Sequence, residues 1–183
     1  KDKVQGKAMV EAALEINHWC AGEVMYQGTD MRTGSALEIY RSGVGRCGEE
    51  AVFVVNVMRS AGIPARPVYV PRWSHCDDNH AWVEVWCDGD WHYLGACEPE
   101  AVLDKGWFTN AASRAMMIGS RWYDRAMPDE KVIGKDGMNR IINLLGKYAK
   151  TRWITITVED LDGTPAAGAK VRAEVMNYGE FSP

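Results

Sequence analysis

Two side chains in this sequence have the chemistry of a thiol nucleophile and its base. Cys47 follows a glycine-containing stretch and begins an apolar run, and His80 begins an alternating run. Free N–H groups at a helix N-terminus stabilise a thiolate and can donate to an oxyanion, and Arg46 adds positive charge. A histidine within hydrogen-bond distance can take the thiol proton. The pair therefore predicts acyl-transfer chemistry, although each residue alone is more often structural.

The helices that must position this pair follow from hydrophobic periodicity. Apolar residues at steps of three and four predict helices over residues 7–20 and 47–61. Gly22 is expected to end the first helix, and Gly62-Ile63-Pro64 the second. Residues 28–45 are predicted to be a loop, whereas residues 100–150 fit helix, strand or turn equally well.

The strands follow from alternation. Residues 65–70 and 80–86 read as strands, and Asp88-Gly89 predicts a two-residue hairpin turn into a partner strand over 91–94. Apolar residues occupy the other face of the second strand. The face that begins with the candidate base carries His80, Trp82, Glu84 and Trp86.

The stretch GRCGEEAVFVVNVMRSAGIPARPVYV, followed by NHAWVEVWCDGDWHYLGACEP, resembles the transglutaminase-like superfamily. The resemblance is specific over residues 40–100 and looser over 7–110. It implies an α+β fold with a papain-like core over residues 1–150, in which the Cys-bearing helix packs on an antiparallel sheet. It also implies that an amide carbonyl acylates Cys47 and that His80 is the general base and acid.

The third catalytic residue of the family, an Asp on the strand after the His strand, falls here on Gly95. Continued hairpin pairing would place Cys97 opposite His80 and Gly95 diagonally across on the same face. Glu98 is the candidate replacement, although a regular strand would point its side chain to the wrong face. Two local alternatives precede the histidine. They are Asp78 and Asn79.

Aromatic and polar residues around the pair predict a substrate groove. Trp73, Trp82 and Trp107 are candidate groove walls. A second donor to the oxyanion is expected upstream of the nucleophile, and such a residue would also contact substrate. The candidates are Tyr26, Gln27 and Tyr40. Each of these residues is more often structural than functional.

Composition excludes several function classes. Lys+Arg is 21 and Asp+Glu is 25, for a net charge of -4, so binding of nucleic acid through phosphate neutralisation is not expected. No apolar run reaches the roughly 18 residues of a membrane-spanning helix. The five cysteines are odd in number and show no C-x-x-C spacing, so no structural zinc site is expected. A metal at the polar run 75–80 is a remote alternative, and no cofactor is expected.

The last part of the chain, residues 151–183, has a different pattern. Alternation over 151–160 and 169–175, separated by Asp162-Gly163-Thr164-Pro165, predicts strands and a turn. The segment resembles the start of a carboxypeptidase-regulatory-like or immunoglobulin-like β-sandwich. That resemblance implies a further C-terminal domain in a longer bacterial protein of the surface or periplasm, and hence an extracytoplasmic location.

Two functions remain open. The first is a thiol enzyme that cleaves an amide bond of a peptide or protein, with hydrolysis favoured because no residue in the sequence marks an amine-acceptor site. The second is a catalytically degenerate module of the same fold that binds a peptide or glycan in a Trp-rich cleft. Gly95 is the residue that motivates the second hypothesis.

Overall fold

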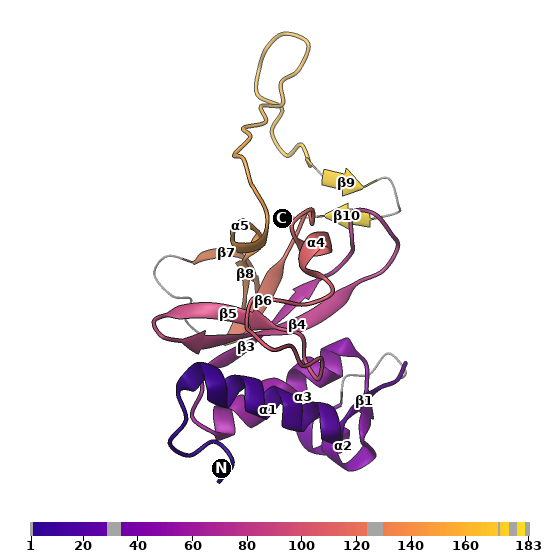
Figure 1. The fold of residues 1–183 in the computed structure, drawn as a ribbon. Helices are drawn as coiled ribbons and strands as arrows, with labels where there is room; N and C mark the ends of the chain where they lie inside the picture. Colours follow the sequence, from indigo (N-terminus) through magenta and orange to yellow (C-terminus); the bar gives the residue numbers. More distant parts are fainter. Residues whose placement is uncertain (1, 29–33, 124–129, 172, 176–178, 182–183) are drawn as a thin grey trace.

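The computed structural model describes residues 2–28, 34–123, 130–171, 173–175 and 179–181. Figure 1 shows helices α1, α2 and α3 on one side of an antiparallel sheet. Their bounds are Met9–Glu23, Ala36–Ser42 and Cys47–Ser60. The predicted α+β fold, with the Cys-bearing helix packed on an antiparallel sheet, is therefore confirmed.

The main sheet has six strands in the described part of the chain, in the order β5-β4-β3-β6-β8-β7, and every neighbouring pair is antiparallel. The strands are β3 (Ala65–Val70), β4 (His80–Cys87), β5 (Asp90–Leu94), β6 (Gly119–Tyr123), β7 (Lys131–Asp136) and β8 (Asn139–Asn143). A short parallel pair, β1 (Met25–Tyr26) and β2 (Val44–Gly45), leads into α3.

The predicted helices form, with two differences from the prediction. α1 runs through Gly22 to Glu23, so this glycine does not end it. α2 lies inside the predicted loop 28–45, and that prediction is wrong for residues 36–42. A capping box starts α2, because the Glu38 carboxylate accepts the Ser35 N–H at 2.7 Å and Ser35 Oγ accepts the Glu38 N–H at 3.4 Å.

The β4–β5 hairpin has the predicted register. Trp86 pairs with Trp91, and the turn residues Asp88 and Gly89 both have positive φ angles, 53° and 93°. That geometry suits the right-handed twist of a two-residue hairpin. The register therefore holds along β5 as far as Leu94.

The predicted pairing of His80 with Cys97 is wrong. The chain leaves the ladder after β5 and turns, with Cys97 at φ 56° and a bridge between Gly95 and Glu98. Asn17 of α1 holds this turn, since its side chain donates to the Gly95 carbonyl at 2.8 Å and accepts the Cys97 N–H at 3.0 Å. These two hydrogen bonds from α1 therefore direct residues 95–98 away from the sheet.

The core has two parts, one on each face of the sheet. The first lies between the helices and β4, where Val83 and Val85 are fully buried. The second lies on the opposite face, around Trp82, Phe108 and Ile142. Alternation along β4 is thus as predicted, with His80 and Trp82 on the face away from the helices.

The region left ambiguous by the sequence contains β6, β7, β8 and two short helices, α4 (Thr109–Ala112) and α5 (Leu145–Tyr148). Beyond α5 the chain leaves the body as an extended arm (Figure 1). The predicted strand over 151–160 does not form, because no strand in the described part of the chain pairs with it, apart from an isolated Glu159–Pro165 bridge. Farther along, β9 (Ala173–Val175) pairs with β10 (Gly179–Phe181).

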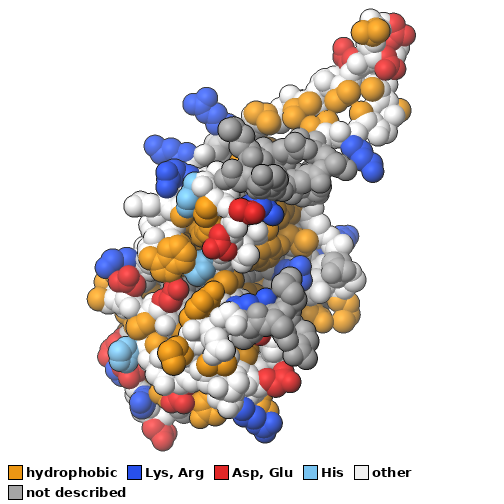
Figure 2. All heavy atoms as spheres, turned by 90° about the vertical axis from the view of Figure 1, so that its right-hand side faces the viewer, with side chains coloured by type: hydrophobic (Ala, Val, Ile, Leu, Met, Phe, Trp, Pro, Cys, Tyr) orange, Lys and Arg blue, Asp and Glu red, His pale blue; other side chains and the backbone are white. Residues whose placement is uncertain are grey.

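The arm exposes hydrophobic side chains, which form a row along the projection in Figure 2. They include Trp153, Ile154, Ile156 and Leu161. The Lys131 ammonium lies 3.8 Å from the centre of the Trp153 ring. In the described ranges, the helices are too short or too polar to cross a bilayer.

Candidate active site

Cys47 is the first residue of α3, where the helix N-terminus faces the start of β4. The chain reaches it through the β1–β2 pair, which the Gln27 N–H extends by donating to the Gly45 carbonyl at 2.8 Å. The Cys47 sulfur accepts hydrogen bonds from the backbone N–H groups of Ala81 and Gly48. The thiol is therefore held between the helix and the strand that carries His80.

The predicted catalytic residues meet at one pocket. A hollow of about 440 Å³ is lined by Cys47, His80 and Glu98, which come from α3, β4 and the turn after β5. Its other lining residues are Tyr26, Arg46, Asp78, Asn79 and Trp107. Three segments that are distant in sequence thus supply the three side chains of a candidate triad.

His80 is enclosed by aromatic rings and is 6% exposed. The ring centres of Trp107, Phe108, Trp82 and Trp73 lie 4.6, 5.0, 5.9 and 6.3 Å from its own. Burial among these rings disfavours the imidazolium and lowers the pKa of His80 to about 4. The ring is thus fixed in position, and its burial favours the neutral form.

The Glu98 carboxylate occupies the space that a side chain at position 95 would fill. A Cβ atom added to Gly95 would lie 2.3 Å from Glu98 Oε2 and 2.8 Å from Glu98 Cβ. Glu98 Oε2 is 3.9 Å from His80 Nε2, and Glu98 Oε1 accepts the Trp107 indole N–H at 3.0 Å. The turn at 95–98 therefore returns a carboxylate to the histidine, which a regular strand would not have done.

The facing atoms have no other partner. His80 Nε2 and Glu98 Oε2 are both buried, and neither forms a hydrogen bond within the described ranges. A donor and an acceptor 3.9 Å apart are just outside hydrogen-bond distance. A small rotation of the Glu98 side chain would close the contact when a proton arrives on the ring.

The thiol itself differs from the expectation. Burial raises the pKa of Cys47 above its ordinary value, and the N–H groups of Ala81 and Gly48 only partly offset this. Glu50 and Glu98 raise it further. The expected lowering of the Cys47 pKa is therefore not found: burial favours the thiol form of Cys47 and the neutral form of His80. Such a pair can still react, because the imidazole takes the proton as the sulfur attacks.

Trp82 and Trp73 do not form groove walls. Both are buried in the core beneath His80, so these two substrate-contact predictions are wrong. The Trp82 indole N–H donates to Tyr148 Oη at 2.9 Å, and Tyr148 donates to Glu84 Oε1 at 2.6 Å. The buried Arg66 donates to Glu84 Oε2 at 2.6 Å. This network fixes the Trp82 ring, against which the His80 ring packs.

The remaining predicted contacts divide between the pocket and the exterior. Tyr26 and Trp107 line the Cys47 pocket, and Trp107 is 63% exposed at its rim. Tyr40 instead packs on Trp19 and Phe53, with ring centres 6.2 and 5.9 Å away, and it is not among the residues that line the Cys47 pocket. Gln27 is exposed and is not among the residues that line this pocket.

Two important residues have no catalytic signal in the sequence. Asn17, which holds the 95–98 turn, lies beside the apolar stripe of the first helix and is buried. A polar residue next to this stripe is the only signal that the sequence offers. Glu50 fits an ordinary first-turn acidic residue. It lines a pocket together with residues 97 and 98, which are distant in sequence.

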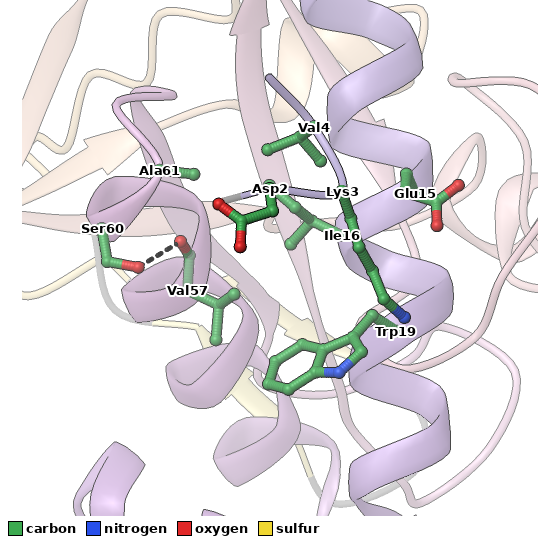
Figure 3. Close-up of a pocket in the computed structure, with 9 residues that line it drawn as sticks. All are labelled: Asp2, Lys3, Val4, Glu15, Ile16, Trp19, Val57, Ser60 and Ala61. Carbon is green, nitrogen blue, oxygen red and sulfur yellow. Dashed lines mark hydrogen bonds between the residues drawn. The ribbon is translucent and has the colours of Figure 1, made fainter. Parts of the chain in front are cut away.

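Another pocket, of about 450 Å³, lies at the opposite end of the helix layer (Figure 3). It opens between the N-terminal residues, α1 and the last turns of α3, and Trp19 and Val57 line it. Ten residues of helix separate Val57 from Cys47, or about 15 Å. Among the side chains that the structure describes, no three of His, Cys, Asp or Glu are grouped to hold a metal ion, and all five cysteines are free thiols.

Comparisons with known proteins identify the superfamily. The sequence model of the transglutaminase-like superfamily matches residues 2–96, more than half of the chain. No curated protein matches significantly.

Similar solved structures include a protein from Cytophaga hutchinsonii named as a putative cysteine protease, at 20% identity and a TM-score of 0.42 over 72% of this chain and 51% of that one. LapG of Legionella pneumophila is 17% identical, with a TM-score of 0.46 over 56% of this chain and 61% of that one. An EGTA-treated form of LapG is 16% identical, with a TM-score of 0.46 over 56% and 60%. The chain thus covers less than two thirds of the length of each.

Proposed function

Because this chain belongs to the transglutaminase-like superfamily, we propose that it is a thiol enzyme that cleaves an amide bond of a peptide or protein through an acyl-Cys47 intermediate. The observation that carries the proposal is the meeting of Cys47, His80 and Glu98 at one pocket. The side chains supply a nucleophile, a base and a carboxylate beside the base, which is the arrangement that acyl transfer requires.

Each step follows from these positions. The Cys47 sulfur attacks the amide carbon while His80 takes the thiol proton, and N–H groups at the start of α3 stabilise the oxyanion. The tetrahedral intermediate then breaks its C–N bond, and His80 gives the proton to the departing amine. A water molecule attacks the thioester, with His80 again as base, and releases the carboxylic acid and the thiol.

Glu98 acts when the imidazolium forms. Its carboxylate is 3.9 Å from His80 Nε2, so it stabilises the positive charge that burial would otherwise oppose. Trp107 holds the carboxylate through its other oxygen. In this proposal Glu98 replaces the missing side chain at Gly95 as the residue that orients the ring.

A second candidate is a non-catalytic module that binds a peptide or glycan in the same pocket. The observation that favours it is the burial of both side chains, which raises the pKa of Cys47 and lowers that of His80 and so disfavours a thiolate–imidazolium pair. The exposed Trp107 at the rim would then serve as a binding surface.

Acylation by an active ester separates the two candidates. We expect p-nitrophenyl acetate to acetylate Cys47, as read by peptide mass spectrometry, and the rate to fall by about 10²–10⁴-fold in His80→Ala. His92→Ala is the matched control, because His92 pairs with Asp104 on the hairpin, away from the pocket. An unmodified Cys47, or an equal rate in His80→Ala, would refute the proposed thiol enzyme and leave the binding module as the candidate.

We further propose that residues 1–150 form the enzyme core and that 151–183 begin a separate β domain of an extracytoplasmic protein. The row of exposed hydrophobic side chains on the arm supports the division, because such a row normally packs against another part of a protein. Limited proteolysis near residue 150 should release a core that unfolds cooperatively and still acylates Cys47. A core that unfolds after this cleavage would refute the boundary.

A further inference from the structure

A second pocket adjoins the Cys47 pocket and is acidic. It has a volume of about 520 Å³ and shares Tyr26 and Glu98 with the Cys47 pocket. Glu23, Glu50 and Glu98 line it, and among the residues that the structure describes no Lys, Arg or His does. Val24 and Met25 add apolar surface beside the carboxylates.

Glu50 is the unusual member of this pocket. It lies one helical turn after Cys47, on the same side of α3, and it is 3% exposed. No described residue forms a hydrogen bond or an ion pair with its carboxyl group. Burial and the nearby Glu98 raise the pKa of Glu50 to about 8. Its carboxyl oxygens are not among the fully enclosed atoms that lack a partner, so they reach the pocket, where a ligand can pair with a carboxyl that the described residues leave unpaired.

We propose that this pocket binds a cationic group on an alkyl chain, the ammonium of a lysine-like amine or a guanidinium, beside the amide bond that Cys47 attacks. The cation would pair with Glu50, while its aliphatic stem would lie along Met25 and Tyr26. The inference rests on the proposed function and adds to it the substrate class: a peptide with a basic group next to the reacting carbonyl, or an accepting amine that carries a second, basic group.

An organic cation fits this pocket better than a metal ion does. The carboxylates that line it are not grouped as a metal-holding cluster in the described part of the chain. The pocket is also much larger than a metal ion requires, and its exposed rim residues Met25 and Tyr26 are apolar or amphipathic. These features suit a long side chain that ends in a charge.

Paired alkylating agents test the pocket without knowledge of the natural substrate. Two iodoacetamides carry the same six-carbon arm, one ending in ammonium and the other in hydroxyl, and each alkylates Cys47. We expect the ammonium reagent to react at least about 10-fold faster in the wild type, as a charged hydrogen bond allows. In Glu50→Gln the ratio of the two rate constants should fall to about 1.

Glu15→Gln is the control, because it changes the net charge equally but lines the distant pocket of Figure 3. Its ratio should equal that of the wild type. A wild-type ratio near 1, with normal alkylation by the neutral reagent, would overturn the inference and leave the proposed function intact. A Cys47 that neither reagent modifies would overturn the proposed function, and the inference with it.

Two further arms identify the source of the cation. Peptide esters with Lys or norleucine beside the ester carbonyl are compared as acyl donors, and cadaverine is added to the acetylated enzyme. Faster acylation by the Lys peptide assigns the pocket to the cleaved substrate. Saturable formation of N-acetylcadaverine assigns it to an accepting amine. The absence of both effects would refute the proposal.

Discussion

Exchanging the residues at positions 95 and 98 tests whether Glu98 acts on His80 from the space left by Gly95. Three variants are needed: Glu98→Ala, Gly95→Ala, and the double variant Gly95→Asp with Glu98→Ala. The first removes the carboxylate, and the second places a methyl group 2.3 Å from Glu98 Oε2 and 2.8 Å from Glu98 Cβ. The third empties the space and returns a carboxylate to it from the neighbouring strand end.

The geometry sets the expected magnitudes. A carboxylate and an imidazolium 3.9 Å apart attract by about 4 kcal/mol at an effective dielectric constant of ~20, or about 10³ in rate. The Glu98 side chain is 36% exposed, so solvent reduces this and we expect Glu98→Ala to lose about 10²-fold. Gly95→Ala should lower the free energy of unfolding by about 1–3 kcal/mol, because it overpacks the turn.

The assay is the rate of Cys47 acylation by an active ester, together with urea unfolding of each variant. The double variant should acylate at least about 10-fold faster than Glu98→Ala, since an Asp at position 95 begins where the Glu98 carboxylate lay. It should also unfold at higher urea than Gly95→Ala.

The reasoning would be refuted by two results. One is an acylation rate in Glu98→Ala equal to that of the wild type, which would remove Glu98 from the mechanism. The other is a stable Gly95→Ala variant with full activity, which would show that the two side chains do not compete for one space.

The remaining predictions concern the surroundings of the site. Since burial lowers the pKa of His80 to about 4 and raises that of the Glu98 carboxyl above its ordinary value, kcat/KM should first fall on the acid side as Glu98 is protonated, and fall further as pH drops toward 4; a first fall that persists in Glu98→Ala would show that another group causes it. Trp107→Phe keeps a ring beside the histidine but loses the N–H bond to the orienting carboxylate, so acylation should slow by about 10-fold while the urea midpoint stays unchanged. Tyr148→Phe leaves one oxygen of the buried Glu84 without its donor, so the free energy of unfolding measured in urea should fall by about 1–3 kcal/mol. An unchanged free energy would mean that a water molecule replaces the lost donor.

Local patterns predict the parts of the fold whose causes are local. The apolar period of α3 and the Asp88-Gly89 turn depend on neighbouring residues, so the helix and the hairpin register follow from the sequence. Ser35 and Glu38 are also a readable helix start, but the surrounding glycines favoured a loop.

The route by which Glu98 reaches the histidine does not follow from local pattern. It depends on Asn17, which lies 78 residues before Gly95 and binds the backbone on both sides of the turn. It also depends on a positive φ at Cys97, a backbone conformation that residues other than glycine seldom adopt. A strand that simply continued would have kept Glu98 on the wrong face, and this is why the sequence left its role in doubt.

Moving the acid from a strand to a turn has a consequence for the two pockets. Glu98 lines both of them, whereas a short side chain on the strand at position 95 would face the histidine alone. A cation held only by Glu98 would compete with the imidazolium for the same carboxylate and so slow the reaction. Glu50 resolves this conflict, because its carboxyl lies within the acidic pocket and has no other partner among the described residues. A bound cation can then ionise Glu50 and leave Glu98 free to stabilise His80.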